Sequence, residues 1–171
     1  MKKLILSIAL LFGMAIGASA QKFALVDMEY ILKNIPAYEM ANEQLNQLSQ
    51  KWQKEIENKT TQASEAYQQY QSDFIFLSDD QKRQREEAVT AIEKEAAELR
   101  YKYFGPEGEL YQKRKSLIEP IQDQIYEAVK KLADEKGYQA IFDRASASDI
   151  IFASPRIDVS NDVLARLGYS R

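Results

Sequence analysis

Carboxylates are the most plentiful groups for acid–base chemistry in this chain, because its 171 residues include 26 Asp and Glu but no histidine and no cysteine. Ser-His-Asp triads, Cys-His pairs and zinc sites built on Cys or His are therefore excluded. Paired carboxylates act as general acid and base where a dry pocket shifts their pKa values. Here they are spread along helical segments as on a solvated face, and the sequence has no GxxxxGK[ST] or GxGxxG pattern. We expect neither an enzyme nor a bound cofactor or metal.

Aromatic and apolar side chains in the middle of the chain are the remaining candidates for binding. Such side chains offer adaptable apolar faces, and tyrosine adds a polar tip. Most of them have the spacing of a helix-packing seam, and packing is the preferred interpretation for Tyr70, Phe74 and Tyr103. The candidate contacts to a binding partner are Ile75, Phe76, Tyr67, Tyr101 and Tyr111.

Two long helices must position these residues. From Pro36 to Gly137 the chain is rich in Glu, Gln, Lys, Ala and Leu, which lose little on entering a helix. Apolar and small residues recur at spacings of three and four, which predicts the seam of a coiled coil. The seam residues are Leu45, Leu48, Trp52, Ile56, Ala63, Ala66, Tyr70, Phe74 and Leu77, followed by Val89, Ile92, Ala96, Leu99 and Tyr103.

A capping pattern separates the two helices. Ser78 precedes Gln81 by three residues, and Asp79 suits the positive end of a new helix. A short turn there makes the helices antiparallel, so that residue i faces roughly residue 156 − i. We predict a coiled-coil tentacle over residues 36–120, with its tip near residue 78 and a length of about 60 Å at 1.5 Å per residue.

Gly105, Pro106 and Gly108 interrupt the returning helix. Proline removes a backbone donor, and glycine weakens a helix on either side of it. The fold-back places this interruption opposite Trp52, with Phe104 available to pack against it. We predict a kink near residues 105–108 rather than a domain boundary, although a plain end of one helix and start of the next would give the same pattern.

The two ends of the chain, residues 21–35 and 121–171, form a small β-rich body. A strand is predicted at residues 23–26, a β-hairpin from residues 138–143 and 149–153, and a short helix capped by Ser160. A body of roughly 65 residues without disulfides is marginal alone, so we expect copies to associate through it. The predicted oligomer core is Phe23, Leu25, Val26, Ile141, Phe142, Ile151 and Phe152.

The first twenty residues have the features of a secretory signal peptide. Lys2 and Lys3 precede an apolar run that ends in Ala18-Ser19-Ala20, which predicts cleavage between Ala20 and Gln21 and export. Without the two lysines the formal charge of −3 becomes −5. An exported acidic chain is a poor candidate for nucleic-acid binding, and its charge gives no support to contact with an anionic membrane surface.

The order of these elements resembles the Skp/OmpH-like family of periplasmic chaperones. The residues that carry the resemblance lie at the two ends, at 23–28, 138–143, 149–153 and 157–164. It implies a mainly α fold with a small β part, in which three chains form a homotrimer around a shared β-barrel and hold tentacles about a cavity. Such proteins act without ATP as holdases for unfolded outer-membrane proteins in the periplasm. The alternative is a structural coiled-coil scaffold or spacer of the cell envelope.

Overall fold

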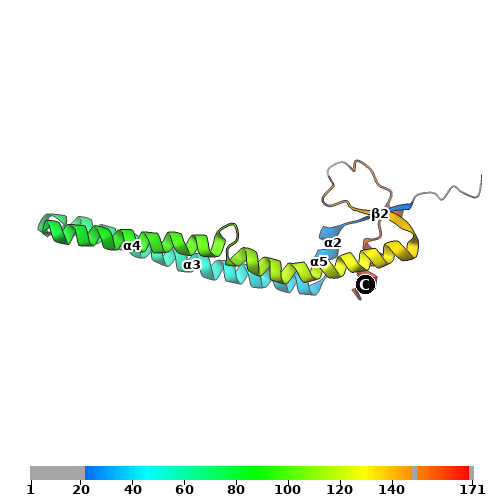
Figure 1. Cartoon of the computed structure of the whole chain (residues 1–171), viewed down its shortest axis with the longest axis horizontal. Coiled ribbons are helices and arrows are strands. Elements are labelled where there is room, and N and C mark those ends of the chain that lie inside the picture. The colour runs from blue at the N-terminus through cyan, green and yellow to red at the C-terminus, as the bar shows by residue number, and fades with distance from the viewer. Residues whose placement is uncertain (1–21, 148–149, 170–171) are drawn as a thin grey trace, which may run out of the picture. The chain divides into compact units, whose positions relative to one another are not determined.

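The computed structural model describes residues 22–147 and 150–169, so the predicted signal peptide lies outside the described residues. The elements follow the order β1, α2, α3, η2, α4, α5, β2, η3 and α6 (Figure 1). The chain divides into two compact units. We call residues 35–123 the arm unit and the other described residues the body unit. No helix of the described chain is long and apolar enough to cross a lipid bilayer.

The arm unit is built on two antiparallel helices, α3 (Pro36–Asp73) and α4 (Asp79–Phe104), which lie side by side (Figure 1). The predicted seam is largely confirmed, because all its members except Phe74 are buried or half-buried. The buried members are Leu45, Trp52, Ile56, Ala63 and Tyr70 on α3, and Val89, Ala96 and Tyr103 on α4.

Polar pairs between α3 and α4 report the register of the hairpin. Lys59 Nζ lies 2.7 Å from Glu95 Oε2, and the Tyr70 hydroxyl donates to Glu86 Oε1 over 2.5 Å. The residue numbers in each pair add up to within two of the predicted 156. The fold-back inferred from the sequence is therefore confirmed.

The turn at the end of the hairpin is closed by a capping box. After the 3₁₀ turn η2 (Phe74–Phe76), the Ser78 N–H donates to Gln81 Oε1 over 2.9 Å and the Gln81 N–H donates to Ser78 Oγ over 3.4 Å. The two bonds satisfy backbone donors that the first turn of α4 would otherwise leave free. The predicted tip near residue 78 is thus where the chain reverses.

The interruption of the returning helix near residues 105–108 is a short loop, the end of one helix and start of the next that the same sequence pattern allowed. α4 ends at Phe104 and α5 (Glu109–Lys136) begins after the loop. A Cβ on Gly105 would lie 2.4 Å from the Tyr101 carbonyl oxygen, and one on Gly108 would lie 2.8 Å from a carbonyl of α4. Both positions therefore need glycine because the backbone folds tightly upon itself.

The first residues of helix α5 belong to the arm unit. Leu110 packs against the buried cluster around Trp52, so the loop lies inside the arm unit and does not separate units. Pro120 lies within α5 and does not end it, although a proline there leaves the carbonyl of Ser116 without its helical donor. α5 contributes residues to both units.

The body unit contains a parallel sheet of two strands, β1 (Lys22–Val26) and β2 (Tyr138–Asp143). Ala24 is paired with Ile141 and Leu25 with Phe142. The predicted β-hairpin of residues 138–143 and 149–153 is wrong: residues 150–153 are not a strand, and residues 148–149 lie outside the described chain. β2 pairs with β1 instead, because the whole intervening helical segment serves as the crossover that parallel strands require.

Short elements complete the body unit: α2 (Met28–Lys33), the 3₁₀ turn η3 (Pro155–Ile157) and α6 (Ser160–Arg166). Ile125 of α5 and Val163 of α6 are fully buried. Ser160 is the first residue of α6, and its side chain is not the predicted cap. The mainly α fold with a small β part is confirmed.

Candidate functional site

The tip of the arm exposes apolar side chains next to residues that are packed and hydrogen-bonded. Ile75 and Phe76 of η2 are each 81 % exposed. The ring centroid of Phe74 lies 5.6 Å from that of Tyr70 in an edge-to-face arrangement, and 4.4 Å from Lys82 Nζ. The hydrogen bond from the Tyr70 hydroxyl to Glu86, with burial, raises the pKa of Tyr70 to about 12. The turn thus presents two apolar side chains that its own packing does not use.

The other predicted contacts are exposed but not gathered into one site. Tyr67 lies on α3, Tyr101 on α4 and Tyr111 on α5, and all three have exposed rings. Tyr67 contacts the ring of Tyr70 at 6.4 Å. No ring contact joins Tyr67, Tyr101 and Tyr111 to one another within the described residues. The three exposed rings are therefore dispersed along the arm.

An aromatic cluster lies where the loop interrupts the returning helix. The expected contact between Trp52 and Phe104 is present, with centroids 6.4 Å apart and rings edge to face. Trp52 stacks more closely on Tyr103, whose hydroxyl donates to Glu55 Oε2 over 3.1 Å. Burial and this carboxylate raise the pKa of Tyr103. Across the loop, Lys102 pairs with Glu109 at 3.4 Å.

Two adjoining hollows run along the α3–α4 hairpin, and sequence reasoning did not find them. Their volumes are about 540 and 420 Å³, and Thr60 and Arg100 line both. The small seam residues Ala63 and Ala96 are buried beneath the second hollow. The sequence contained a signal for these hollows, because alanines at seam positions of two facing helices leave space that larger side chains would fill.

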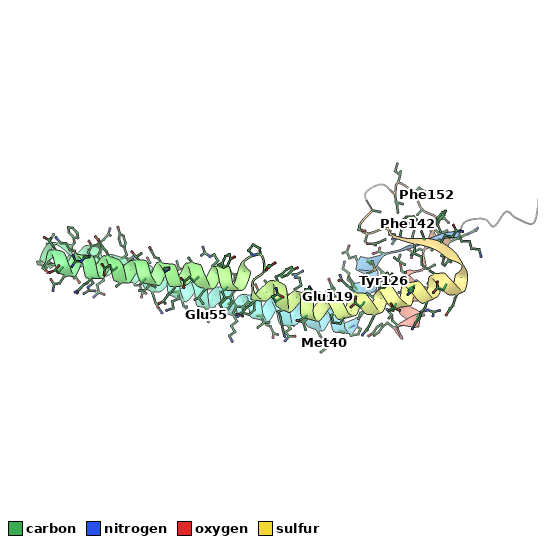
Figure 2. All side chains as sticks on the ribbon, in the orientation of Figure 1. Met40, Glu55, Glu119, Tyr126, Phe142 and Phe152 are labelled. Atoms are coloured by element: carbon green, nitrogen blue, oxygen red, sulfur yellow. The ribbon has the colours of Figure 1, made fainter. Side chains whose placement is uncertain are left out.

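The predicted oligomer core is only partly covered by the chain itself. Leu25 and Val26 are buried within the body unit and Ile141 is half-buried. Phe142 (Figure 2) and Phe23 are exposed, and their ring centroids lie 6.2 Å apart. Ile151 and Phe152 are 100 % and 85 % exposed. The described chain does not cover these four apolar side chains.

Residues 22–147 and 150–169 contain no group of three or more acidic side chains placed to hold a metal ion. Many carboxylates of the arm form exposed ion pairs, for example Asp80 with Arg83 at 2.9 Å.

The sequence matches the family described as "Outer membrane protein (OmpH-like)" over residues 22–167. The chain belongs to the OmpH-like family. The match spans every described strand and helix of both units.

A solved structure has the same fold. It is an OmpH-like protein from Caulobacter crescentus CB15, described as a candidate outer membrane chaperone, with a TM-score of 0.68 and 11 % sequence identity. The match covers 88 % of this chain and 86 % of that chain. No curated protein matches the sequence.

In this OmpH-like chain a charged network ties together the segments that end the two strands. Asp27 Oδ1 accepts from the Tyr30 N–H over 2.8 Å, and Arg144 donates to Asp27 Oδ2 and lies 3.3 Å from Asp158 Oδ2. The Tyr30 N–H and the Arg144 guanidinium hold the pKa of Asp27 below its ordinary value, against the opposite effect of burial. Ser160, 3 % exposed, accepts from the Asp27 N–H over 2.8 Å. The network thus links β1, β2 and α6 in the body unit.

Proposed function

We propose that this OmpH-like chain is an ATP-independent periplasmic holdase chaperone. It binds unfolded outer-membrane β-barrel proteins and prevents their aggregation. The observation that carries the proposal is the pair Ile75 and Phe76, which a stable, capped turn exposes to solvent at the end of a two-helix arm. Large exposed apolar side chains of this kind mark interaction sites. Family membership and the description of the solved relative support the same role.

We further infer that the working form is a homotrimer in which the bodies share a β-barrel and the arms surround a cavity. The exposed Phe142, Ile151 and Phe152 support association through the body, because burying them against other copies removes apolar surface from water. Many weak contacts along several arms would then act at high effective concentration on one client. The signal peptide, cleaved between Ala20 and Gln21, delivers the chain to the periplasm.

An aggregation assay tests the holding activity. An outer-membrane β-barrel protein unfolded in urea is diluted into buffer with the mature chain, and light scattering is followed. A holdase suppresses scattering when trimer and client are present in equal amounts, whereas a coiled-coil spacer of the envelope leaves it unchanged. Native mass spectrometry of the same mixture should show three chains with one client. A lone monomer that leaves scattering unchanged would contradict both parts of the proposal.

A further inference from the structure

The adjoining hollows on the α3–α4 hairpin differ from the rest of the arm surface in how their charges are compensated. Every other cation of α4 forms an ion pair: Lys82 with Asp79, Arg83 with Asp80, Arg85 with Asp73, Lys94 with Glu98 and Lys102 with Glu109. Arg100 lines both hollows, and no ion pair or side-chain hydrogen bond joins it to any described residue.

Apolar side chains flank Arg100 in both hollows, and the polar residues Gln53, Glu57, Thr60, Ser64 and Glu93 also line them. Ile56 and Phe104 line the larger hollow, while Ala63 and Tyr67 line the smaller one. A guanidinium presents a planar fork of donors that matches a carboxylate, and such charge-assisted hydrogen bonds are stronger than neutral ones. An unpaired guanidinium with apolar neighbours therefore complements an acidic side chain flanked by apolar ones.

The length of the groove sets the size of its occupant. On α3 the lining extends from Gln53 to Tyr67, which corresponds to about 21 Å at 1.5 Å per residue. An extended chain advances about 3.3 Å per residue, so the groove accommodates roughly six residues. Arg100, shared by the two hollows, lies at the junction between them.

We propose that this groove binds an extended segment of an unfolded client in which one Asp or Glu lies between apolar residues, with the carboxylate on Arg100. The inference rests on the proposed holdase function and adds to it the sequence feature that one arm recognises. Glu57 and Glu93 also line the groove, one in each hollow, and neither lies within 4.0 Å of Arg100. They disfavour a second acidic residue in the bound segment.

Labelled heptapeptides with blocked ends test the proposal by fluorescence anisotropy. The three peptides alternate apolar and small residues and differ only in a central Glu, Gln or Lys. The intact mature protein should bind the Glu peptide about threefold to fivefold more tightly than the Gln peptide, as expected for one exposed ion pair. Arg100→Gln should abolish this preference, Arg100→Glu should invert it toward the Lys peptide, and Glu57→Gln should strengthen binding of the Glu peptide.

Lys94→Gln is the matched control, because it removes one cation from the same helix outside the groove. It should leave the preference intact, and circular dichroism should show that all variants remain helical. A preference that is missing in the wild type, or that survives Arg100→Gln, would overturn the proposal. So would an equal loss of all three peptides, which would make Arg100 a structural residue.

Two parallel measurements separate the alternatives. If Arg100→Gln changes the sedimentation of the protein but not peptide selectivity, the groove is covered by a second copy and the proposal fails. If the wild type suppresses client aggregation but shows no carboxylate preference, the groove inference fails and the holdase function stands. If the wild type does not suppress aggregation, the holdase function itself fails, whichever peptides bind.

Discussion

The indole of Trp52 on α3 lies flat against the phenol ring of Tyr103 on α4, with ring centroids 4.8 Å apart and planes within 5° of parallel. The pair is buried together with Ile56, and Leu48, Leu99 and Leu110 pack against it. A two-helix arm has little interior, so this cluster concentrates much of the apolar burial available beside the loop.

Trp52→Ala should destabilise the arm by about 3–5 kcal/mol, the usual effect of removing a large buried aromatic side chain. Urea unfolding followed by circular dichroism at the helical band measures the change. Tyr101→Ala is the control, because Tyr101 is an exposed aromatic residue on the same helix as Tyr103. Similar midpoints for the two variants would contradict the importance of the stack.

Replacing Gly105 with alanine should disrupt the loop between α4 and α5. The new Cβ would meet the Tyr101 carbonyl oxygen at 2.4 Å, so the backbone must move, at a cost of about 1–3 kcal/mol. Thermal unfolding gives the loss of stability, and the near-ultraviolet circular dichroism of Trp52 reports movement beside the loop. Glu107→Ala alters the same loop without a new backbone clash and should unfold like the wild type.

The loss of folding stability at alkaline pH should depend on Tyr70. The hydrogen bond to Glu86 and burial raise its pKa to about 12, whereas an unfolded tyrosine ionises near pH 10. The stabilisation is therefore complete below about pH 10 and is lost as the pH rises to about 12. Tyrosinate absorbance should show late-titrating groups, since the pKa of Tyr103 is also raised, and Tyr70→Phe should remove one such group. Glu86→Gln should move that group to lower pH, and superimposable titrations would refute the assignment.

The loss of folding stability at acid pH should depend on Asp27. Its pKa is lowered in the folded state, first by the Tyr30 N–H and then by Arg144, so its stabilisation is present above the unfolded pKa near 3.9 and disappears as the pH falls below it. Asp27→Asn should lower the free energy of unfolding at pH 7 and change it little at pH 2. Urea unfolding at both pH values tests this. An equal loss at both would indicate packing rather than charge.

Changing the tip should separate client binding from stability. Ile75→Ser with Phe76→Ser removes exposed apolar surface, so the free energy of unfolding should change by no more than about 0.5 kcal/mol. Suppression of client aggregation should nevertheless require several-fold more protein. Met40→Ser changes an exposed apolar residue of α3 outside the tip (Figure 2) and should leave suppression unchanged. Equal suppression by the tip variant and the wild type would show that Ile75 and Phe76 do not contact the client.

The helical arm was predictable because its information is local. The seam spacing, the Ser78–Gln81 cap and the fold-back number together place Tyr70 opposite Glu86 before any coordinates are known. The interruption at Gly105 and Pro106 was also visible, but not that the backbone would fold into a loop tight enough to exclude a Cβ.

The sheet was not predictable in the same way. Residues 138–143 pair with β1, which lies more than a hundred residues earlier in the chain. The residues that favour a local turn do not indicate which distant strand a segment will pair with. The groove was missed for a related reason. Ala63 and Ala96 looked like ordinary seam residues, and only their joint position leaves room beside Arg100, whose lack of an ion pair cannot be known until every neighbour is placed.

The fixed register of the hairpin constrains how such an arm changes in length during evolution. Lys59 faces Glu95 and Tyr70 faces Glu86. An insertion in α3 alone would therefore shift the register between α3 and α4 for all pairs on one side of the insertion. Lengthening therefore requires matched insertions on both sides of Ser78, most simply in whole heptads that return the seam to the same side. The reach of the protein changes in discrete increments of about 10 Å, and relatives with longer or shorter arms should differ by symmetric gaps about the turn.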